Sequence, residues 1–69
     1  MRIGQLVKLK PYTEVYFSDP QVGSVRYVNE CETCYCIFLG FFDHNGTCDV
    51  LLDGAVGYNV SPLDLEEVS

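Results

Sequence analysis

The stretch CIFLGFFDHNGTCDVLL, residues 36–52, decides the fold because it contains two apolar runs on either side of a turn signal. Asn45 and Gly46 both tolerate the positive φ angles that a type I′ turn requires. A turn at these two residues would place Phe41 opposite Val50. The stretch therefore predicts a β-hairpin at the centre of an all-β chain.

This register divides the side chains of the hairpin between two faces, because successive residues of a strand point to opposite sides. One face is expected to form the core, and it collects Ile37, Leu39, Phe41, Cys48, Val50 and Leu52. The other face is also apolar, with Cys36, Phe38, Phe42 and Leu51. A chain of 69 residues has room for one interior, so a second apolar face needs a cover. Either the long first loop or another protein would cover Phe38, Phe42 and Leu51.

The rest of the chain reads as short strands and turns, with no apolar periodicity of a helix. We expect a strand with Ile3, Val7 and Leu9 on one face, and a final strand that carries Leu65 and Val68. The other expected elements are a long loop or irregular hairpin over 11–23, a strand over 24–28, a turn at 53–54 and a 3₁₀ turn over 61–64. The prediction is one all-β domain over 1–69, a small barrel of about five short antiparallel strands.

Charge excludes one class of partner. The net charge is −6, and all four basic residues precede Tyr27. A chain of this charge repels phosphate backbones, so we expect no nucleic-acid binding. No apolar run reaches the ~20 residues of a membrane helix, and the first residues do not form a signal peptide, so we expect no membrane contact. We therefore expect synthesis in a cytoplasm that keeps thiols reduced.

The cysteines allow a zinc site as an alternative. Cys31, Cys34, Cys36 and Cys48 supply four thiols, and C-x₂-C is the usual zinc half-site. A second C-x₂-C is missing, so the pattern is partial. The favoured interpretation is that these cysteines are apolar strand residues and that the chain needs no cofactor. A disulfide would require oxidation after release from the cell.

Nothing in the sequence indicates catalysis. His44 is the only histidine, and no neighbouring group is identified that would hold it as a base. The aromatic residues of the first loop, Tyr12, Tyr16 and Phe17, are typical instead of a second contact patch. We therefore expect a non-enzymatic protein that works by contact with other proteins.

A resemblance narrows this expectation. The motifs GQLVKLK (4–10), LLDG (51–54) and VSPLDLEEV (60–68) resemble those of short bacteriophage proteins. The order of elements is similar to that of an SH3-like barrel, which ends with a helical turn and a last strand. The chain has no Trp, so it departs from the SH3 domains that bind proline-rich peptides.

The resemblance implies a minor structural component of a phage head or tail, made in the host cytoplasm and carried in the virion. Its partners would be other virion proteins or copies of itself. Two alternatives stay open: a small zinc-stabilised regulator or adaptor, and a host-directed phage inhibitor with an acidic surface.

Overall fold

The computed structural model describes residues 1–41 and 46–68, which form one antiparallel sheet. The order of its strands is β3-β2-β6-β5-β4-β1-β7. The all-β prediction is confirmed, but residues 1–41 and 46–68 form seven strands where about five were expected, and no pairing between β3 and β7 closes them into a barrel. In sequence the elements are β1 Leu6–Leu9, β2 Glu14–Asp19, β3 Gly23–Val28, β4 Cys34–Phe41, β5 Cys48–Leu52, β6 Ala55–Val60, the 3₁₀ helix η1 Pro62–Asp64, and β7 Leu65–Glu67.

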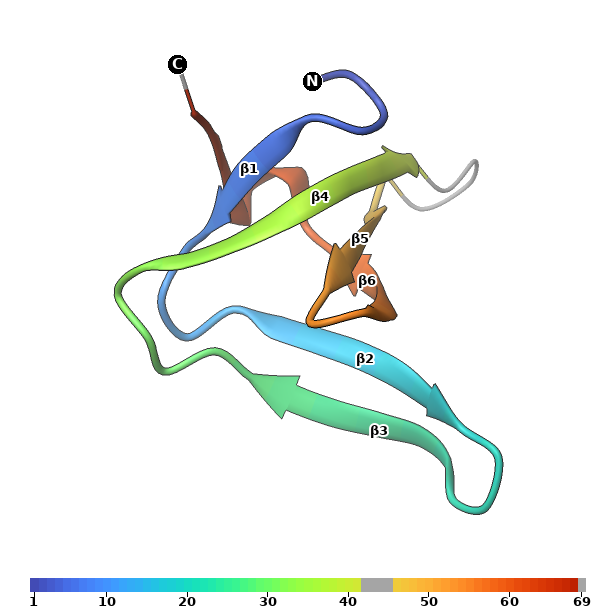
Figure 1. The fold of residues 1–69 in the computed structure, drawn as a ribbon. Coiled ribbons are helices and arrows are strands. Elements are labelled where there is room, and N and C mark those ends of the chain that lie inside the picture. The colour runs from blue at the N-terminus through green and yellow to red at the C-terminus, as the bar shows by residue number, and fades with distance from the viewer. Residues whose placement is uncertain (42–45, 69) are drawn as a thin grey trace.

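The segment expected as a long loop or irregular hairpin contains β2, which pairs with β3 and with β6. Residues 14–19 form β2 and pair with β3 from Glu14↔Val28 to Asp19↔Gly23, so the segment belongs to a regular hairpin. A carboxylate oxygen of Asp19 accepts hydrogen bonds from the backbone N–H groups of Gln21 and Val22 and closes the turn. Figure 1 shows this hairpin projecting below the other strands. Of the two alternatives predicted for residues 11–23, the long loop is wrong, whereas a hairpin is present and is regular rather than irregular.

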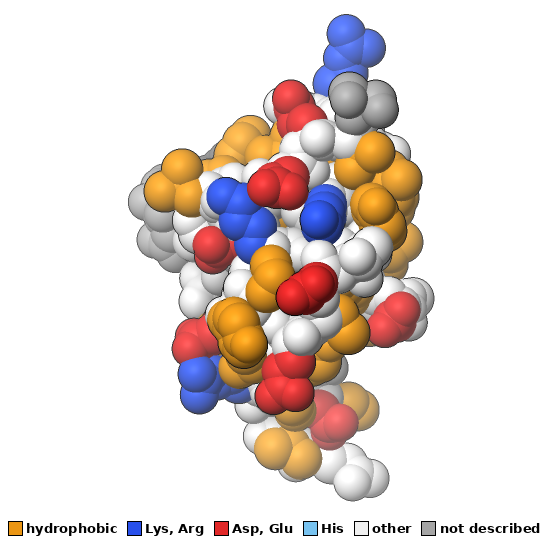
Figure 2. Space-filling model, turned by 90° about the vertical axis from the view of Figure 1, so that its left-hand side faces the viewer, with side chains coloured by type: hydrophobic (Ala, Val, Ile, Leu, Met, Phe, Trp, Pro, Cys, Tyr) orange, Lys and Arg blue, Asp and Glu red, His pale blue; other side chains and the backbone are white. Residues whose placement is uncertain are grey.

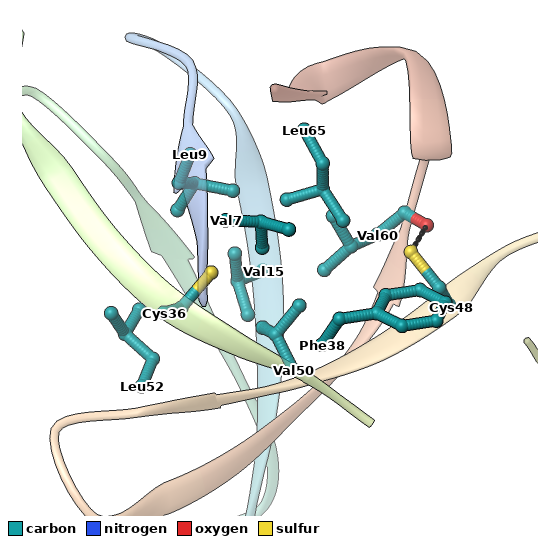
Figure 3. Packing of buried hydrophobic residues seen from close by; sticks show 10 residues of the cluster. All are labelled: Val7, Leu9, Val15, Cys36, Phe38, Cys48, Val50, Leu52, Val60 and Leu65. Carbon is teal, nitrogen blue, oxygen red and sulfur yellow. Dashed lines mark hydrogen bonds between the residues drawn. The ribbon is translucent and has the colours of Figure 1, made fainter. Parts of the chain in front are cut away.

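The core lies on the inner side of the curved sheet and draws on six of the seven strands (Figure 3). Val7, Val15, Val50 and Val60 are fully buried, and Phe38 is the largest side chain among them. Cys48 also belongs to the core, and its thiol donates a hydrogen bond to the carbonyl oxygen of Val60 over 3.2 Å. The core cluster consists of Val7, Leu9, Val15, Cys36, Phe38, Cys48, Val50, Leu52, Val60 and Leu65.

The register of the central hairpin differs from the predicted one. Phe41 pairs with Cys48, whereas Phe38 pairs with Val50, so Leu39 is an additional residue that has no partner on β5. Such a β-bulge moves every side chain beyond it to the opposite face. Phe38 consequently points into the core, where the sequence analysis had placed it outside. The type I′ turn expected at Asn45–Gly46 cannot be compared, because Asn45 lies outside the described residues.

The faces predicted for β4 are therefore wrong, whereas those of β1 and β5 hold. Of the expected core residues, Cys48, Val50 and Leu52 are buried, but Phe41 is 57% exposed and Ile37 and Leu39 are only half-buried. Val7 and Leu9 share the core face of β1 as predicted. Ile3 precedes β1 and is exposed.

Both turns predicted near the C-terminus are present. Asp53 and Gly54 have φ angles of 51° and 79° and join Leu52 to Ala55, as in a two-residue type I′ hairpin. Pro62–Asp64 form the 3₁₀ turn, and the hydroxyl of Ser61 accepts a hydrogen bond from the N–H of Leu63. Leu65 then enters the core, but Val68 follows β7 and is exposed.

A buried amide joins the two connections at one end of the sheet. The Asn29 side chain donates to the carbonyl oxygens of Lys10 and Cys31 and accepts from the N–H of Cys31. Thr13, also buried, donates from its hydroxyl to the carbonyl oxygen of Lys10. These bonds fix the β1–β2 connection against the β3–β4 connection.

None of the helices described in the structure is both long and apolar enough to cross a membrane.

Candidate protein-interaction surfaces

An apolar row crosses the outer face of four neighbouring strands. Leu6 of β1 pairs with Ile37 of β4, Ile37 with Leu51 of β5, and Leu51 with Val56 of β6. Directly paired residues share a face. The residues that flank Ile37 and Leu51 along their strands, and Val7 after Leu6, belong to the core. The four side chains, called the outer row below, therefore form one continuous line on the surface.

The outer row is accessible to a partner. Leu51 is 37% exposed and Val56 is 53% exposed, while Leu6 is exposed and Ile37 half-buried. A single exposed apolar residue is ordinary, but a line of them across four strands is not. This arrangement is typical of a surface that another protein covers.

Polar and aromatic groups border the outer row on both sides. Tyr35 lies two residues before Ile37 and pairs with Lys8, which also pairs with Glu66. On the other side, Asp49 and Tyr58 share the outer face by the alternation of β5 and β6. An apolar centre with a polar rim is the usual composition of a protein–protein interface.

Only one of the three residues expected at the centre of the contact lies in the outer row. Leu51 is there, as the sequence analysis predicted. Phe38 is only 1% exposed and belongs to the core, because the bulge at Leu39 reverses the faces of β4. Phe42 lies outside the described residues.

The expected second patch of Tyr12, Tyr16 and Phe17 is divided. Tyr12 is 77% exposed in the β1–β2 connection. Tyr16 lies on the outer face of β2, with its ring centroid 6.3 Å from that of Tyr58. Phe17 points to the inner face, beside the ring of Tyr27 at 6.2 Å. These three aromatic residues are close in sequence but lie on three different surfaces.

Phe17 belongs to a hollow between the β2–β3 hairpin and the β5–β6 turn. The hollow has a volume of about 190 Å³ and is lined by Phe17, Tyr27, Leu52, Asp53 and Ala55. Its walls are mostly apolar, and Asp53 is their one charged group. Burial raises the pKa of Tyr27, and the nearby groups Cys34, Cys31, Asp53 and Glu30 raise it further. This hairpin hollow is the second candidate surface.

The edge of β3 adjoins the hairpin hollow. β3 pairs with β2 on one side, and within 1–41 and 46–68 no strand pairs with its other side. The strand is six residues long, and all of its residues are exposed except Val28, which is half-buried. The opposite end of the sheet, β7, has three residues with Glu66 and Glu67. β3 therefore offers the longer edge for backbone pairing.

The cysteines do not assemble the zinc site considered above. Cys31 is exposed and Cys34 half-buried, whereas Cys36 and Cys48 lie in the core. The part of the chain that the structure describes contains no group of three or more His, Cys, Asp or Glu side chains arranged to hold a metal ion. Burial raises the pKa of Cys36 and of Cys48 to about 11 in each case. Both core thiols are therefore protonated at neutral pH.

Charges of both signs alternate on the face of the molecule shown in Figure 2. The Lys and Arg side chains are separated there by acidic and apolar groups. Arg26 is paired with Glu14 across β2 and β3. This face therefore presents no continuous positive field of the kind that binds phosphate backbones.

Two of the four members of the outer row, Leu6 and Val56, were not predicted from the sequence, and Ile37 was predicted to face the core. The signal for Val56 was available, because it follows the Asp53–Gly54 turn and must pair with Leu51. No sequence signal indicates the bulge that turns Ile37 outward. No family model matches the chain, and no curated protein or solved structure matches it.

Proposed function

We propose that the chain is a non-catalytic protein–protein interaction module that binds its partner through the outer row. The observation that carries this proposal is the unbroken apolar line Leu6, Ile37, Leu51 and Val56 across four strands. Complete burial of an apolar side chain of this size is worth about 1.5–3 kcal/mol relative to exposure. Covering four half-exposed side chains supplies a few kcal/mol, which suits a specific contact.

The partner is another protein with a positive rim, rather than a second copy. The chain carries a net charge of −6, so two copies repel each other, whereas a basic surface is attracted. Asp49 and Glu66 on the border of the outer row contribute to this preference, and Lys8 opposes it locally. The partner surface would be apolar at its centre and rich in Lys or Arg at its border.

The place of this contact is a phage particle, and the fold is a variant of the SH3-like barrel with two additional strands. Both statements rest on the resemblance of the GQLVKLK, LLDG and VSPLDLEEV motifs. The η1 turn before β7 and the pairing of β7 with β1 are compatible with the barrel relationship. The partner is then a head or tail protein.

Sedimentation velocity with isolated virion proteins of the phage that encodes the chain tests the proposal. The wild-type chain should form a complex with one of these proteins. Leu51→Asp, which places a charge in the middle of the outer row, should weaken the complex by more than about tenfold. Leu63→Asp is the matched control, because Leu63 is exposed on η1 and lies outside the outer row.

Four results would contradict the proposal. Equal binding by Leu51→Asp and the wild type would show that the outer row is not the contact. Self-association of the wild type that Leu51→Asp abolishes would make the partner a second copy. Binding to a host protein and to no virion protein would support the host-directed inhibitor instead. Melting that a chelator lowers would support the zinc-stabilised adaptor.

A further inference from the structure

We propose that the free edge of β3 and the adjoining hairpin hollow bind an extended, positively charged peptide segment of a partner protein by strand addition. This second surface shares no residue with the outer row, and the two lie on different faces of the sheet. Each proposal can therefore fail without the other.

The backbone of β3 makes strand addition possible. Gly23–Val28 lies at one end of the strand order, and the pairing with β2 uses only one side of the strand. The N–H and C=O groups of alternate residues on the other side are directed away from the sheet. Figure 1 shows β3 at the border of the molecule, on the hairpin that projects from the other strands.

β3 also lacks the devices that usually protect an edge. It contains no proline and no lysine, and its pairing with β2 runs without a bulge over all six residues. Its single charge, Arg26, is neutralised by the carboxylate of Glu14. A strand added here would gain backbone hydrogen bonds along the length of β3 without meeting an unpaired positive charge.

The inner face of the hairpin prepares a place for the side chains of the added strand. Val25 and Tyr27 point to this face and are about two-fifths exposed, at 39% and 40%. Tyr27 and Phe17 form one wall of the hairpin hollow, and Leu52 and Ala55 form the other. An apolar side chain on every second residue of the partner would lie against Val25 and Tyr27, next to the hollow.

Charge selects a basic segment over an acidic one and over a second copy. Asp53 lines the hollow, and Glu30 lies close enough to act on Tyr27. No Lys or Arg occurs from Tyr27 to the end of the chain. Pairing of two copies through β3 would bring together two chains of charge −6. In a segment that alternates apolar and basic residues, the apolar side chains can pack against the hollow and the basic side chains are attracted by the negative charge of the chain.

The test uses the intact chain and the synthetic peptide KVKVKVK, blocked at both ends, with binding measured by fluorescence anisotropy. Saturable binding is expected. The peptide EVEVEVE, of the same length and opposite charge, should bind more than about tenfold more weakly. Asp53→Asn should weaken KVKVKVK by about two- to fivefold, the effect of losing one exposed ion pair. Asn suits this position because it tolerates the positive φ of Asp53.

Two methylated peptides test the backbone pairing itself. N-methylation of the valines blocks the hydrogen bonds of one strand edge, and N-methylation of the lysines blocks the other, without changing the charge. Strand addition requires that one of the two peptides loses binding while the other keeps it. Equal binding by both would mean attraction by charge alone and would overturn the proposal, as would equal binding of EVEVEVE.

Two further results also overturn it. Absence of KVKVKVK binding at millimolar concentration would show that the edge accepts no strand. A chain that forms a dimer in size-exclusion chromatography, and loses it on Tyr27→Lys but not on Leu51→Asp, would have a second copy on the edge. Leu51→Asp should leave KVKVKVK binding unchanged, which separates this surface from the outer row.

Discussion

The side-chain amide of Asn29 donates a hydrogen bond of 3.1 Å to the backbone carbonyl oxygen of Lys10, nineteen residues earlier in the chain. Asn29 is completely buried and bonds to Cys31 through both its amide nitrogen and its oxygen. One side chain thus satisfies backbone groups of two connections that no strand pairing reaches.

Replacement of Asn29 should therefore be among the most damaging polar substitutions. Asn29→Ala leaves the carbonyl oxygen of Lys10 and the N–H of Cys31 without this partner, at a cost of about 2–4 kcal/mol of unfolding free energy. Urea denaturation measures it. Gln21→Ala, at the exposed β2–β3 turn, is the matched amide control and should change stability by less than about 0.5 kcal/mol. Equal losses would mean that the amide is not needed.

Gly57 should not accept a side chain. A Cβ at this position would collide with Cγ1 of Val15 and come within 3.3 Å of the Phe17 ring. We expect Gly57→Ala to cost about 1–3 kcal/mol by overpacking. The double variant Gly57→Ala with Val15→Ala should lose less than the sum of the two single losses, because the smaller residue makes room. Additive losses, measured by urea denaturation, would exclude the collision.

Alanine substitutions at Phe38 and Phe41 should differ in their cost to stability, although both residues are aromatic and lie on one strand. Phe38 is buried, whereas Phe41 is 57% exposed, and the centroids of the two rings lie 5.1 Å apart. Phe38→Ala should cost about 3–5 kcal/mol. Phe41→Ala should cost about 1–2 kcal/mol, because most of its surface is already in water. If Phe41→Ala lost more stability than Phe38→Ala in thermal melts, the register without a bulge would be the correct one.

Alkaline pH should destabilise the fold through its core thiols. Burial raises the pKa of Cys36 and Cys48 from 9.0 to about 11. The folded chain therefore holds these protons more tightly than the unfolded chain, and stability falls as pH rises from about 9 to 11. Urea denaturation under reducing conditions should show the loss. The Cys36→Ala, Cys48→Ala double variant is less stable at pH 8 but should lose less between pH 9 and 11.

Substitutions at the two residues of the β5–β6 turn should differ in their effect on stability. Gly54→Ala places a Cβ at a φ of 79° and should cost about 1 kcal/mol. Asp53→Asn keeps a side chain that tolerates positive φ and should change stability by less than about 0.5 kcal/mol. Thermal unfolding of both variants checks this. A large loss for Asp53→Asn would mean that the Asp53 carboxylate has a structural partner.

Local chemistry made part of this fold predictable. Alternation along β1 gave Val7 and Leu9 as core residues, and Ser61-Pro62 gave the 3₁₀ turn. The Asp53–Gly54 turn was equally readable, because a type I′ turn requires two residues that tolerate positive φ.

Features that depend on distant contacts were not predictable. The bulge at Leu39 has no local signature, and one additional residue exchanged the inside and outside of β4, which removed Phe38 from the expected contact. From the sequence Asn29 is an ordinary loop residue, because its hydrogen bond to Lys10 depends on a contact between distant segments. The outer row as a whole needs the register of four strands at once. Leu51 was identified beforehand, and Val56 could have been found from the Asp53–Gly54 turn, but Leu6 and Ile37 could not.

The unequal ends of the sheet limit how many molecules can join through it. β7 is three residues long and ends in two glutamates, so it offers little to a further strand, whereas β3 is open over six residues. A sheet with one open end cannot join copies head to tail, because such a series needs an open strand at both ends of each copy. The short, acidic β7 edge therefore disfavours fibres built by strand pairing between copies of this chain.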